Sequence, residues 1–310
     1  MANYVRVSTI GTKYYAPDPG LSLAEAVSRM ERHLLGKIEQ VLPDRPDLIV
    51  LPETCDMPAS TTLERRLAFY RERGERILEA LAKVARDNRC YVTYPTIIER
   101  EDGSWSNCIR MLDRSGQIAG TYHKNYPTFS EMGEGVAPGA EATLIECDFG
   151  RVACVICFDL NFDALRLKYA AAQPDLVIFC SMYHGGLMQP YWAYSCRAHF
   201  VSAISNTFPS QIISPVGETI RTNTNYYDFA SEAINLDCAM VHLDGHWGKL
   251  KAMREKYGTK VKVFDPGYLG SVLISSETDE FSARELLREF AFEPLDDYFA
   301  RAMAGCGKQP

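Results

Sequence analysis

The 310-residue sequence lacks the features that mark nucleic-acid-binding and membrane proteins. It has no run of basic residues, and its formal net charge of −7 disfavours binding to nucleic acid and to anionic membranes. No apolar stretch approaches the length of a membrane span, and the first residues lack the charged-then-apolar order of a signal peptide. We therefore expect a cytoplasmic protein with no nucleic-acid partner and no membrane partner.

Patterns for metal sites and disulfides are also missing. The six histidines include no H-E-x-x-H, and the pair at helical spacing, His242 and His246, has Gly245 between its members. The ten cysteines are scattered through apolar segments, which is typical of reduced thiols in a cytoplasmic protein. Cys154 and Cys157 form a C-x-x-C, but residues three apart on a strand face opposite sides of the sheet. A metal hydrolase and a redox enzyme are therefore weak alternatives.

Strand and helix patterns, in contrast, alternate along the whole sequence. Continuous apolar runs predict buried strands at 5–10, 47–51 and 175–180. Apolar residues at helical spacing predict helices at 22–41, 62–87 and 188–203, and short glycine-containing linkers predict hairpins between 90 and 123. With 46% hydrophobic residues the chain can bury a large core, and no repeat or long linker marks a boundary. We predict a single layered α/β domain over residues 1–310.

One stretch, residues 151–161, combines a strand pattern with a reactive side chain. Apolar residues at 152–156 predict a short buried strand that stops at Cys157, and a helical pattern begins at Phe162. A thiol at such a turn is held by a rigid sheet, lies beside a helix N-terminus and can be reached by a substrate. These features favour a nucleophilic cysteine. The alternative is one more core cysteine, since free cysteine is among the most buried residue types.

Two further polar residues follow predicted strands. Glu53 comes just after the run at 47–51, and Lys124 ends the run that starts at Ile118. In a layered α/β fold the carboxyl ends of strands converge on a crevice where ligands bind. A carboxylate there can take a thiol proton, and a lysine ammonium with a backbone N–H can stabilise an oxyanion. Glu53, Lys124 and Cys157 thus supply the minimum set for acyl transfer through a thioester, although each alone could be an ordinary charge or core residue.

Together these residues resemble the motifs of the carbon–nitrogen hydrolase, or nitrilase, superfamily. Residues 48–53 (Leu-Ile-Val-Leu-Pro-Glu) resemble its first motif, whose glutamate is the base. Residues 122–125 (Tyr-His-Lys-Asn) resemble the second, whose lysine stabilises the tetrahedral intermediate, and residues 155–159 (Val-Ile-Cys-Phe-Asp) resemble the third, which carries the nucleophile. The similarity continues to residues 215–218 and so covers most of the chain.

The resemblance implies an α-β-β-α sandwich that needs no metal and no organic cofactor. It also implies a homodimer or higher homo-oligomer, with the C-terminal segment at about 280–310 as a dimer-contact tail. A second glutamate four residues before a Pro-Gly is common in the family, and Glu134 matches that position, with Glu131 as the weaker candidate. Phe158 would lend its backbone N–H to the oxyanion hole. Candidate substrate-binding residues are Tyr126, Asn161, Tyr183, His184 and Trp192. For the four with a ring, the alternative is ordinary aromatic packing in the core.

The residues after the nucleophile indicate a branch of the superfamily. Asp159 resembles the amide-cleaving branches, whereas nitrilases usually have Trp-Glu after the cysteine. Leu160 and Asn161 stand where the N-carbamoyl-D-amino-acid branch has arginines, and Asn161 is similar to the aliphatic amidases. We predict an amidohydrolase whose partner is a small linear amide or ureido (N-carbamoyl) compound. Nitrile hydrolysis by the same triad and a non-catalytic binding module on this scaffold are the alternatives.

Overall fold

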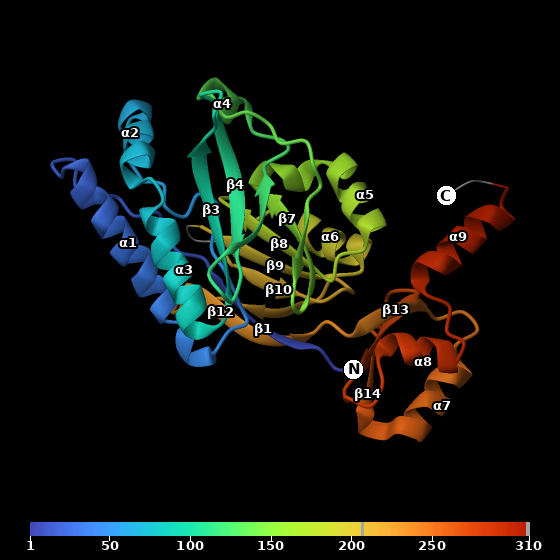
Figure 1. The fold of residues 1–310 in the computed structure, drawn as a ribbon. Helices are drawn as coiled ribbons and strands as arrows, with labels where there is room; N and C mark the ends of the chain where they lie inside the picture. Colours follow the sequence, from blue (N-terminus) through green and yellow to red (C-terminus); the bar gives the residue numbers. More distant parts are fainter. Residues whose placement is uncertain (206–207, 308–310) are drawn as a thin grey trace. The chain divides into compact units, whose positions relative to one another are not determined.

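The apolar runs near residues 5–10, 47–51 and 175–180 all form strands in the computed structural model (Figure 1). They become β1 (Tyr4–Ile10), β2 (Leu48–Val50) and β8 (Leu176–Ser181). All residues of β2 and β8 are buried, which is why these runs carry no polar alternation. The structure describes residues 1–205 and 208–307, and contacts divide the chain into a unit of residues 5–233 and a unit of residues 1–4 with 234–310.

Within the described residues, the larger unit contains two six-stranded sheets. The first has the order β12 (Phe229–Asn235), β1, β2, β3 (Tyr91–Glu99), β4 (Trp105–Leu112) and β5 (Ile118–His123). The second has the order β11 (Thr219–Thr222), β10 (Gln211–Ile213), β9 (His199–Ile204), β8, β7 (Gly150–Ile156) and β6 (Leu144–Cys147). The strands β1, β2 and β3 are parallel, as are β7, β8 and β9. The predicted hairpins are confirmed, since β3, β4 and β5 pair antiparallel.

Helices cover the outer face of each sheet, and the two sheets pack on each other (Figure 1). The first sheet carries α1 (Leu23–Glu39), α2 (Leu63–Arg73) and α3 (Arg76–Asn88), and the second carries α5 (Asp163–Ala172) and α6 (Met188–Cys196). A hydrogen bond joins the two sheets directly, because the Thr9 hydroxyl donates to the Ser202 carbonyl over 2.6 Å. The predicted α-β-β-α sandwich is confirmed.

Two of the predicted helices end earlier than the apolar spacing suggested. The pattern at 62–87 forms two helices, because Gly74 has a φ of 49° and closes α2 before α3 begins. The pattern at 188–203 gives a helix only to Cys196, because Arg197 is left-handed at φ 55° and the apolar residues after it form β9. The spacing of a short apolar run does not show whether it forms a helix or a strand. Pairing with a neighbouring strand of the sheet determines which one forms.

The smaller unit is built on a three-stranded antiparallel sheet of β13 (Cys238–His242), β15 (Ser271–Ser276) and β14 (Val261–Phe264). Its helices are α7 (Trp247–Tyr257), α8 (Ala283–Glu289) and α9 (Leu295–Gly305), and a short 3-10 turn, η3 (Gly258–Lys260), follows α7. A capping box between Ser282 and Glu285 starts α8. No helix in the described part of the chain has the length and apolar character that a membrane span requires. The expectation of one domain over 1–310 stays a prediction.

Candidate active site

Cys157 lies where β7 ends and a short 3-10 helix, η2 (Cys157–Asn161), begins. Its φ of 46° is in the left-handed region, which is uncommon for a residue with a side chain. The carboxylate of buried Asp159 holds this turn: it accepts hydrogen bonds from the Ile156 N–H at 3.1 Å, the Tyr122 hydroxyl at 2.8 Å and the Tyr126 N–H at 2.8 Å. Burial raises the pKa of Asp159 to about 6, although these hydrogen bonds act to lower it. The surrounding contacts therefore fix an otherwise unfavourable backbone conformation.

Lys124 lies buried just after β5 and contacts two carboxylates. Its ammonium donates to Glu53 Oε1 over 2.9 Å and to Glu131 Oε1 and Oε2 over 2.9 and 2.8 Å. Burial by itself would lower the pKa of Lys124, but nearby negative charge, first that of Glu53, outweighs burial and raises the pKa above its ordinary value. Lys124 is therefore a cation in the resting protein.

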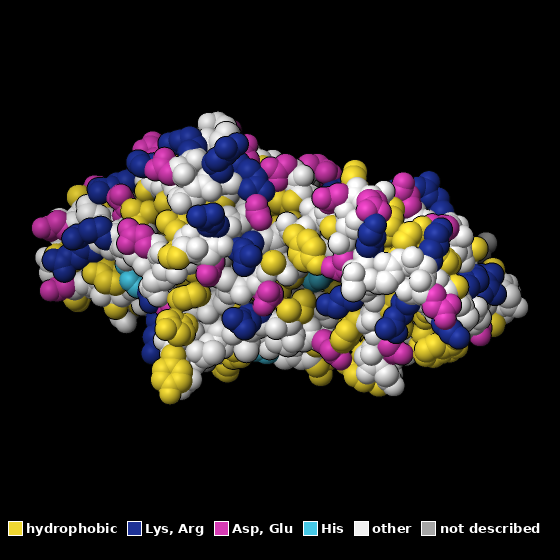
Figure 2. Space-filling model, turned by 90° about the horizontal axis from the view of Figure 1, so that it is seen from below, with side chains coloured by type: hydrophobic (Ala, Val, Ile, Leu, Met, Phe, Trp, Pro, Cys, Tyr) yellow, Lys and Arg dark blue, Asp and Glu magenta, His cyan; other side chains and the backbone are white. Residues whose placement is uncertain are grey.

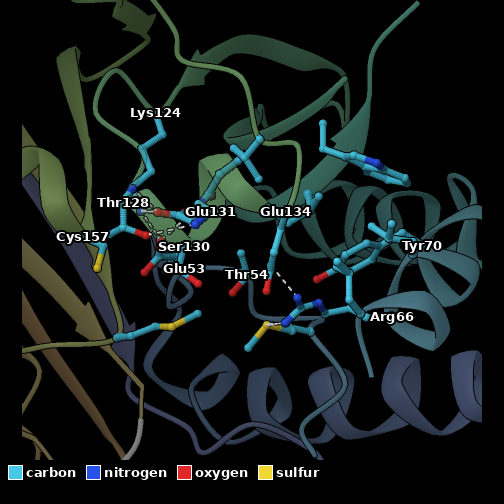
Figure 3. Close-up of a pocket in the computed structure, with 18 residues that line it drawn as sticks. Glu53, Thr54, Arg66, Tyr70, Lys124, Thr128, Ser130, Glu131, Glu134 and Cys157 are labelled. Carbon is cyan, nitrogen blue, oxygen red and sulfur yellow. Dashed lines mark hydrogen bonds and ion pairs between the residues drawn. The ribbon is translucent and has the colours of Figure 1, made fainter. Parts of the chain in front are cut away.

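The carboxylate of Glu53 uses only one of its oxygens in these contacts. Oε1 accepts from Lys124 and, over 2.8 Å, from the side-chain amide of Asn107, which also donates to Glu131 Oε1 over 2.8 Å. Oε2 is buried and has no hydrogen-bond partner within the described residues. Figure 3 shows Glu53, Lys124 and Cys157 together at one end of a cavity. One carboxylate oxygen is thus available to a group beside Cys157.

The cavity that these residues line has a volume of about 280 Å³. Its polar lining combines the predicted triad with Asn107, Thr128 and Glu131, and further apolar and polar side chains complete it: Thr54, Met57, Leu63, Arg66, Leu67, Tyr70, Ile97, Trp105, Ser130, Glu134, Val136 and Met182. No group of three or more His, Cys, Asp or Glu residues among residues 1–205 and 208–307 could hold a metal ion.

The Cys157 thiol is held in its protonated form at rest. Burial and then the negative charge of Glu53 raise the pKa of Cys157 to about 12, although the Lys124 ammonium acts in the opposite direction. A thiol with this pKa carries little thiolate at neutral pH. A nucleophilic attack by this sulfur would therefore require loss of its proton, and the unpaired Oε2 of Glu53 is an acceptor in the lining of the same cavity.

Glu53→Gln should consequently lower the pKa of Cys157 below about 12. The change removes a negative charge from beside the sulfur and leaves the Lys124 ammonium in place. Ultraviolet titration of thiolate absorbance, taken as the difference between Glu53→Gln and Glu53→Gln/Cys157→Ala, measures this pKa. Glu99→Gln removes an exposed carboxylate and serves as the matched control. An unchanged or higher pKa in Glu53→Gln would contradict the electrostatic coupling of the two residues.

The two candidate supporting glutamates lie in different places. Sequence analysis preferred Glu134, but the structure gives the contact with Lys124 to Glu131, while Glu134 pairs with Arg66 over 2.5 Å. The reason is local: Thr128 and Glu131 form a capping box at the start of α4 (Phe129–Gly133), with the Thr128 N–H donating to Glu131 Oε2 over 2.7 Å. Glu134 follows one residue after that short helix ends.

The residues predicted to bind substrate gather around η2 and do not line the described cavity. Tyr126 stacks on Phe162 with ring centroids 3.8 Å apart, and the Phe158 ring meets the same Phe162 edge-on. Asn161 donates to the hydroxyl of Tyr183 over 3.0 Å, and His184 accepts from the Gly186 N–H over 3.1 Å. Trp192 is fully buried and donates to the Leu160 carbonyl over 2.9 Å. Tyr126, Asn161 and Trp192 thus form hydrogen bonds with residues 158–160 of the turn that follows Cys157.

Sequence reasoning missed the residues that form the cavity opposite the triad. Four of them, at positions 63, 66, 67 and 70, follow the helical spacing of one face of α2. A signal existed for Asn107, because asparagine is uncommon within a strand and a buried amide must find partners. For the face of α2 no signal existed, because the sequence does not indicate which helix packs beside the end of which strand.

Comparison with known proteins places the chain in a family. The sequence pattern of the carbon–nitrogen hydrolases matches residues 13–246. The chain belongs to the carbon–nitrogen hydrolase family. The resemblance drawn from the three motifs is thereby confirmed, and Glu53, Lys124 and Cys157 all fall within the matched residues.

Relatives within this family are distant. A hydrolase of Schizosaccharomyces pombe is 24% identical over 173 residues, which make up 53% of this chain and 54% of that protein. An omega-amidase of Danio rerio is 22% identical over 192 residues, 56% of this chain and 67% of that protein. The chain thus matches about half the length of the first of these relatives.

Solved structures of the family share the fold. An amidase from Nesterenkonia sp. aligns with a TM-score of 0.61 at 14% identity, over 74% of this chain and 90% of that one. A mutant of the amidase from Nesterenkonia sp. AN1 aligns with a TM-score of 0.60 at 15% identity, over 75% of this chain and 90% of that one. That structure shows covalent addition of the acetamide moiety of fluoroacetamide at the active site cysteine. At these identities the likeness concerns the fold.

Proposed function

We propose that the chain is a cysteine-dependent amidohydrolase that cleaves the C–N bond of a small linear amide or N-carbamoyl compound. The observation that carries the proposal is the meeting of three groups in one cavity: the Cys157 thiol, the Lys124 cation and the unpaired Oε2 of Glu53. Family membership and the amidase names of relatives support the same reaction class.

Each step of the reaction has a residue of this chain to carry it. Glu53 Oε2 takes the Cys157 proton while the sulfur bonds to the carbonyl carbon, and the carbonyl oxygen becomes an oxyanion beside Lys124 Nζ and the Phe158 N–H. As the C–N bond breaks, Glu53 returns the proton to the leaving nitrogen, and ammonia or an amine departs. Water then attacks the thioester, Glu53 accepts a proton from it, and the acid leaves as the thiol is restored.

Glu131 is a positioning residue in this scheme. Both of its oxygens contact the Lys124 ammonium, and the Thr128 N–H and the Asn107 amide hold the carboxylate in turn. Burial would raise the pKa of Glu131, but Lys124 outweighs it and the pKa is lowered, so the group stays anionic. A fixed anion here keeps Lys124 charged and aimed at the place where the oxyanion forms.

The size of the cavity supports a small substrate. Its volume of about 280 Å³ lies just below the usual range for small-molecule sites, roughly 300–1,000 Å³. Ammonia release across short aliphatic amides, ω-amides, N-carbamoyl amino acids and nitriles tests the proposal, with intact-protein mass spectrometry to detect an acyl group on Cys157. Turnover of nitriles alone would favour a nitrilase, and tight binding of amides without turnover or acylation would favour a binding module.

We also propose that the chain forms a homo-oligomer through its C-terminal segment. The amphipathic helix α9 buries Leu295 at its start, whereas Phe299 and Met303, which follow at i+4 spacing on the same face, are exposed. An exposed apolar face of this kind is typical of a surface that packs against another chain. Sedimentation velocity should find a dimer or larger species, and Phe299→Asp should shift it toward monomer. A monomer in the unaltered protein would contradict this proposal without affecting the catalytic one.

A further inference from the structure

The cavity carries polar side chains at both ends (Figure 3). The triad and Glu131 occupy one end, and Arg66, Tyr70 and Glu134, which we name the distal cluster, occupy the other. Apolar side chains complete the wall: Met57, Leu63, Leu67, Ile97, Trp105 and Val136. A substrate whose amide reaches Cys157 would therefore place a chain along apolar surface and its far end against the distal cluster.

The two charges of the distal cluster are already paired with each other. Arg66 Nη2 donates to Glu134 Oε2 over 2.5 Å, and both side chains are partly shielded from solvent. A carboxylate arriving beside Arg66 would have to compete with Glu134 and would lie close to a like charge. An ammonium beside Glu134 would meet Arg66 in the same way. The Arg66–Glu134 pair thus disfavours the binding of a substrate end with either a positive or a negative charge.

The hydroxyl of Tyr70 is the member of the cluster that is left unpaired. It is buried, it has no hydrogen-bond partner within the described residues, and Figure 3 shows it pointing toward the Arg66–Glu134 pair. Burial, and then the charge of Asp56, raise the pKa of Tyr70 well above its ordinary value, so the group stays a neutral phenol. A buried hydroxyl without a partner is unfavourable, and a ligand that supplies one gains that interaction.

We propose that the distal cluster selects amides whose far end is an uncharged hydrogen-bonding group, which Tyr70 binds. Glu134 is the specificity-determining residue, because it occupies Arg66 and so denies that cation to a carboxylate. This inference rests on the proposed amidohydrolase function and adds the chemical class of the substrate's far end.

Four matched amides test the selection. They are pentanamide and its counterparts that carry a hydroxyl, an ammonium or a carboxylate at the far end, together with shorter and longer homologues of each. We expect the hydroxyl-ended amide to have the highest kcat/KM at the best chain length. Isothermal titration calorimetry of the same amides with Cys157→Ala measures their binding affinities. The order of preference can then be determined even where turnover is slow.

Three variants separate the roles of the distal cluster, and a fourth serves as the control. Glu134→Gln should raise the ratio of kcat/KM for the carboxylate-ended amide to kcat/KM for pentanamide about tenfold or more, the size of a hydrogen bond to a charged partner. Adding Arg66→Gln to it should remove that gain. Tyr70→Phe should abolish the preference for the hydroxyl-ended amide over pentanamide. Glu99→Gln is the control, because it frees Arg71 on the same helix in an exposed pair outside the cavity lining.

The outcomes distinguish this inference from the proposed function. A preference of the unaltered protein for the carboxylate-ended or ammonium-ended amide, or an unchanged ranking in Glu134→Gln, would overturn the inference while amide hydrolysis stands. Absence of both turnover and binding for every amide would overturn the two together. Circular dichroism of each variant shows whether a lost preference reflects a lost fold.

Discussion

Replacing Cys157 by alanine should abolish amide hydrolysis while the protein stays folded. The proposed reaction begins with a bond from Cys157 Sγ to the carbonyl carbon and proceeds through a thioester on that atom, and no other cysteine lines the described cavity. Loss of a nucleophile from a catalytic triad lowers kcat on the order of 10⁶-fold. Ammonia release measures the loss, and circular dichroism and thermal unfolding measure the fold.

Cys154→Ala is the matched control for this prediction. Cys154 lies three residues earlier, within β7, and is fully buried, so its replacement should cost stability but retain turnover. In the unaltered protein a slowly hydrolysed amide should add the mass of an acyl group, and this adduct should be missing from Cys157→Ala. Turnover in Cys157→Ala, or its loss in Cys154→Ala as a dithiol mechanism requires, would refute the assignment.

The layered architecture could be predicted because its elements are specified locally. Apolar runs without polar alternation indicated strands buried on both faces, and β2 and β8 are buried throughout. Ser22 and Glu25 indicated the start of α1 through their capping box, which the structure contains. Two helices were predicted to continue beyond the residues at which they end in the structure, and they show the limit of such patterns. The left-handed backbone at Gly74 and Arg197 is a property of single residues within runs that otherwise keep helical spacing.

The candidate site could be predicted at its reacting end and not at its walls. Glu53, Lys124 and Cys157 each follow a strand, and strand ends converge by the geometry of the sheet, so their meeting follows from local patterns. The choice between Glu131 and Glu134 depended on which way a five-residue helix points, and counting residues to the Pro-Gly could not decide it. The distal wall from α2 depends on the packing of a helix against the sheet, which is a long-range property.

A second large effect is expected outside the cavity lining, where Arg73→Met should lower the free energy of unfolding by about 3–5 kcal/mol. Arg73 closes α2 and is almost fully buried, and its guanidinium donates to Asp56 Oδ2 over 2.5 Å and to the Thr96 hydroxyl over 2.6 Å. Asp56 is fully buried and also accepts from the Tyr94 hydroxyl over 2.6 Å. Removing the arginine leaves a carboxylate inside the protein without its counter-charge, and urea unfolding measures the cost.

The matched control for this prediction is Arg71→Met, two residues earlier on the same helix. Arg71 pairs with Glu99 at the surface, where water and salt screen the charges, so its loss should change the urea midpoint far less. Arg73→Met/Asp56→Leu should recover part of the stability, because no unpaired charge remains buried. Asp56 comes three residues after Glu53, so Arg73→Met should also lower kcat through a displaced base. Equal midpoints for Arg73→Met and Arg71→Met would show that this buried pair contributes no more than an exposed one.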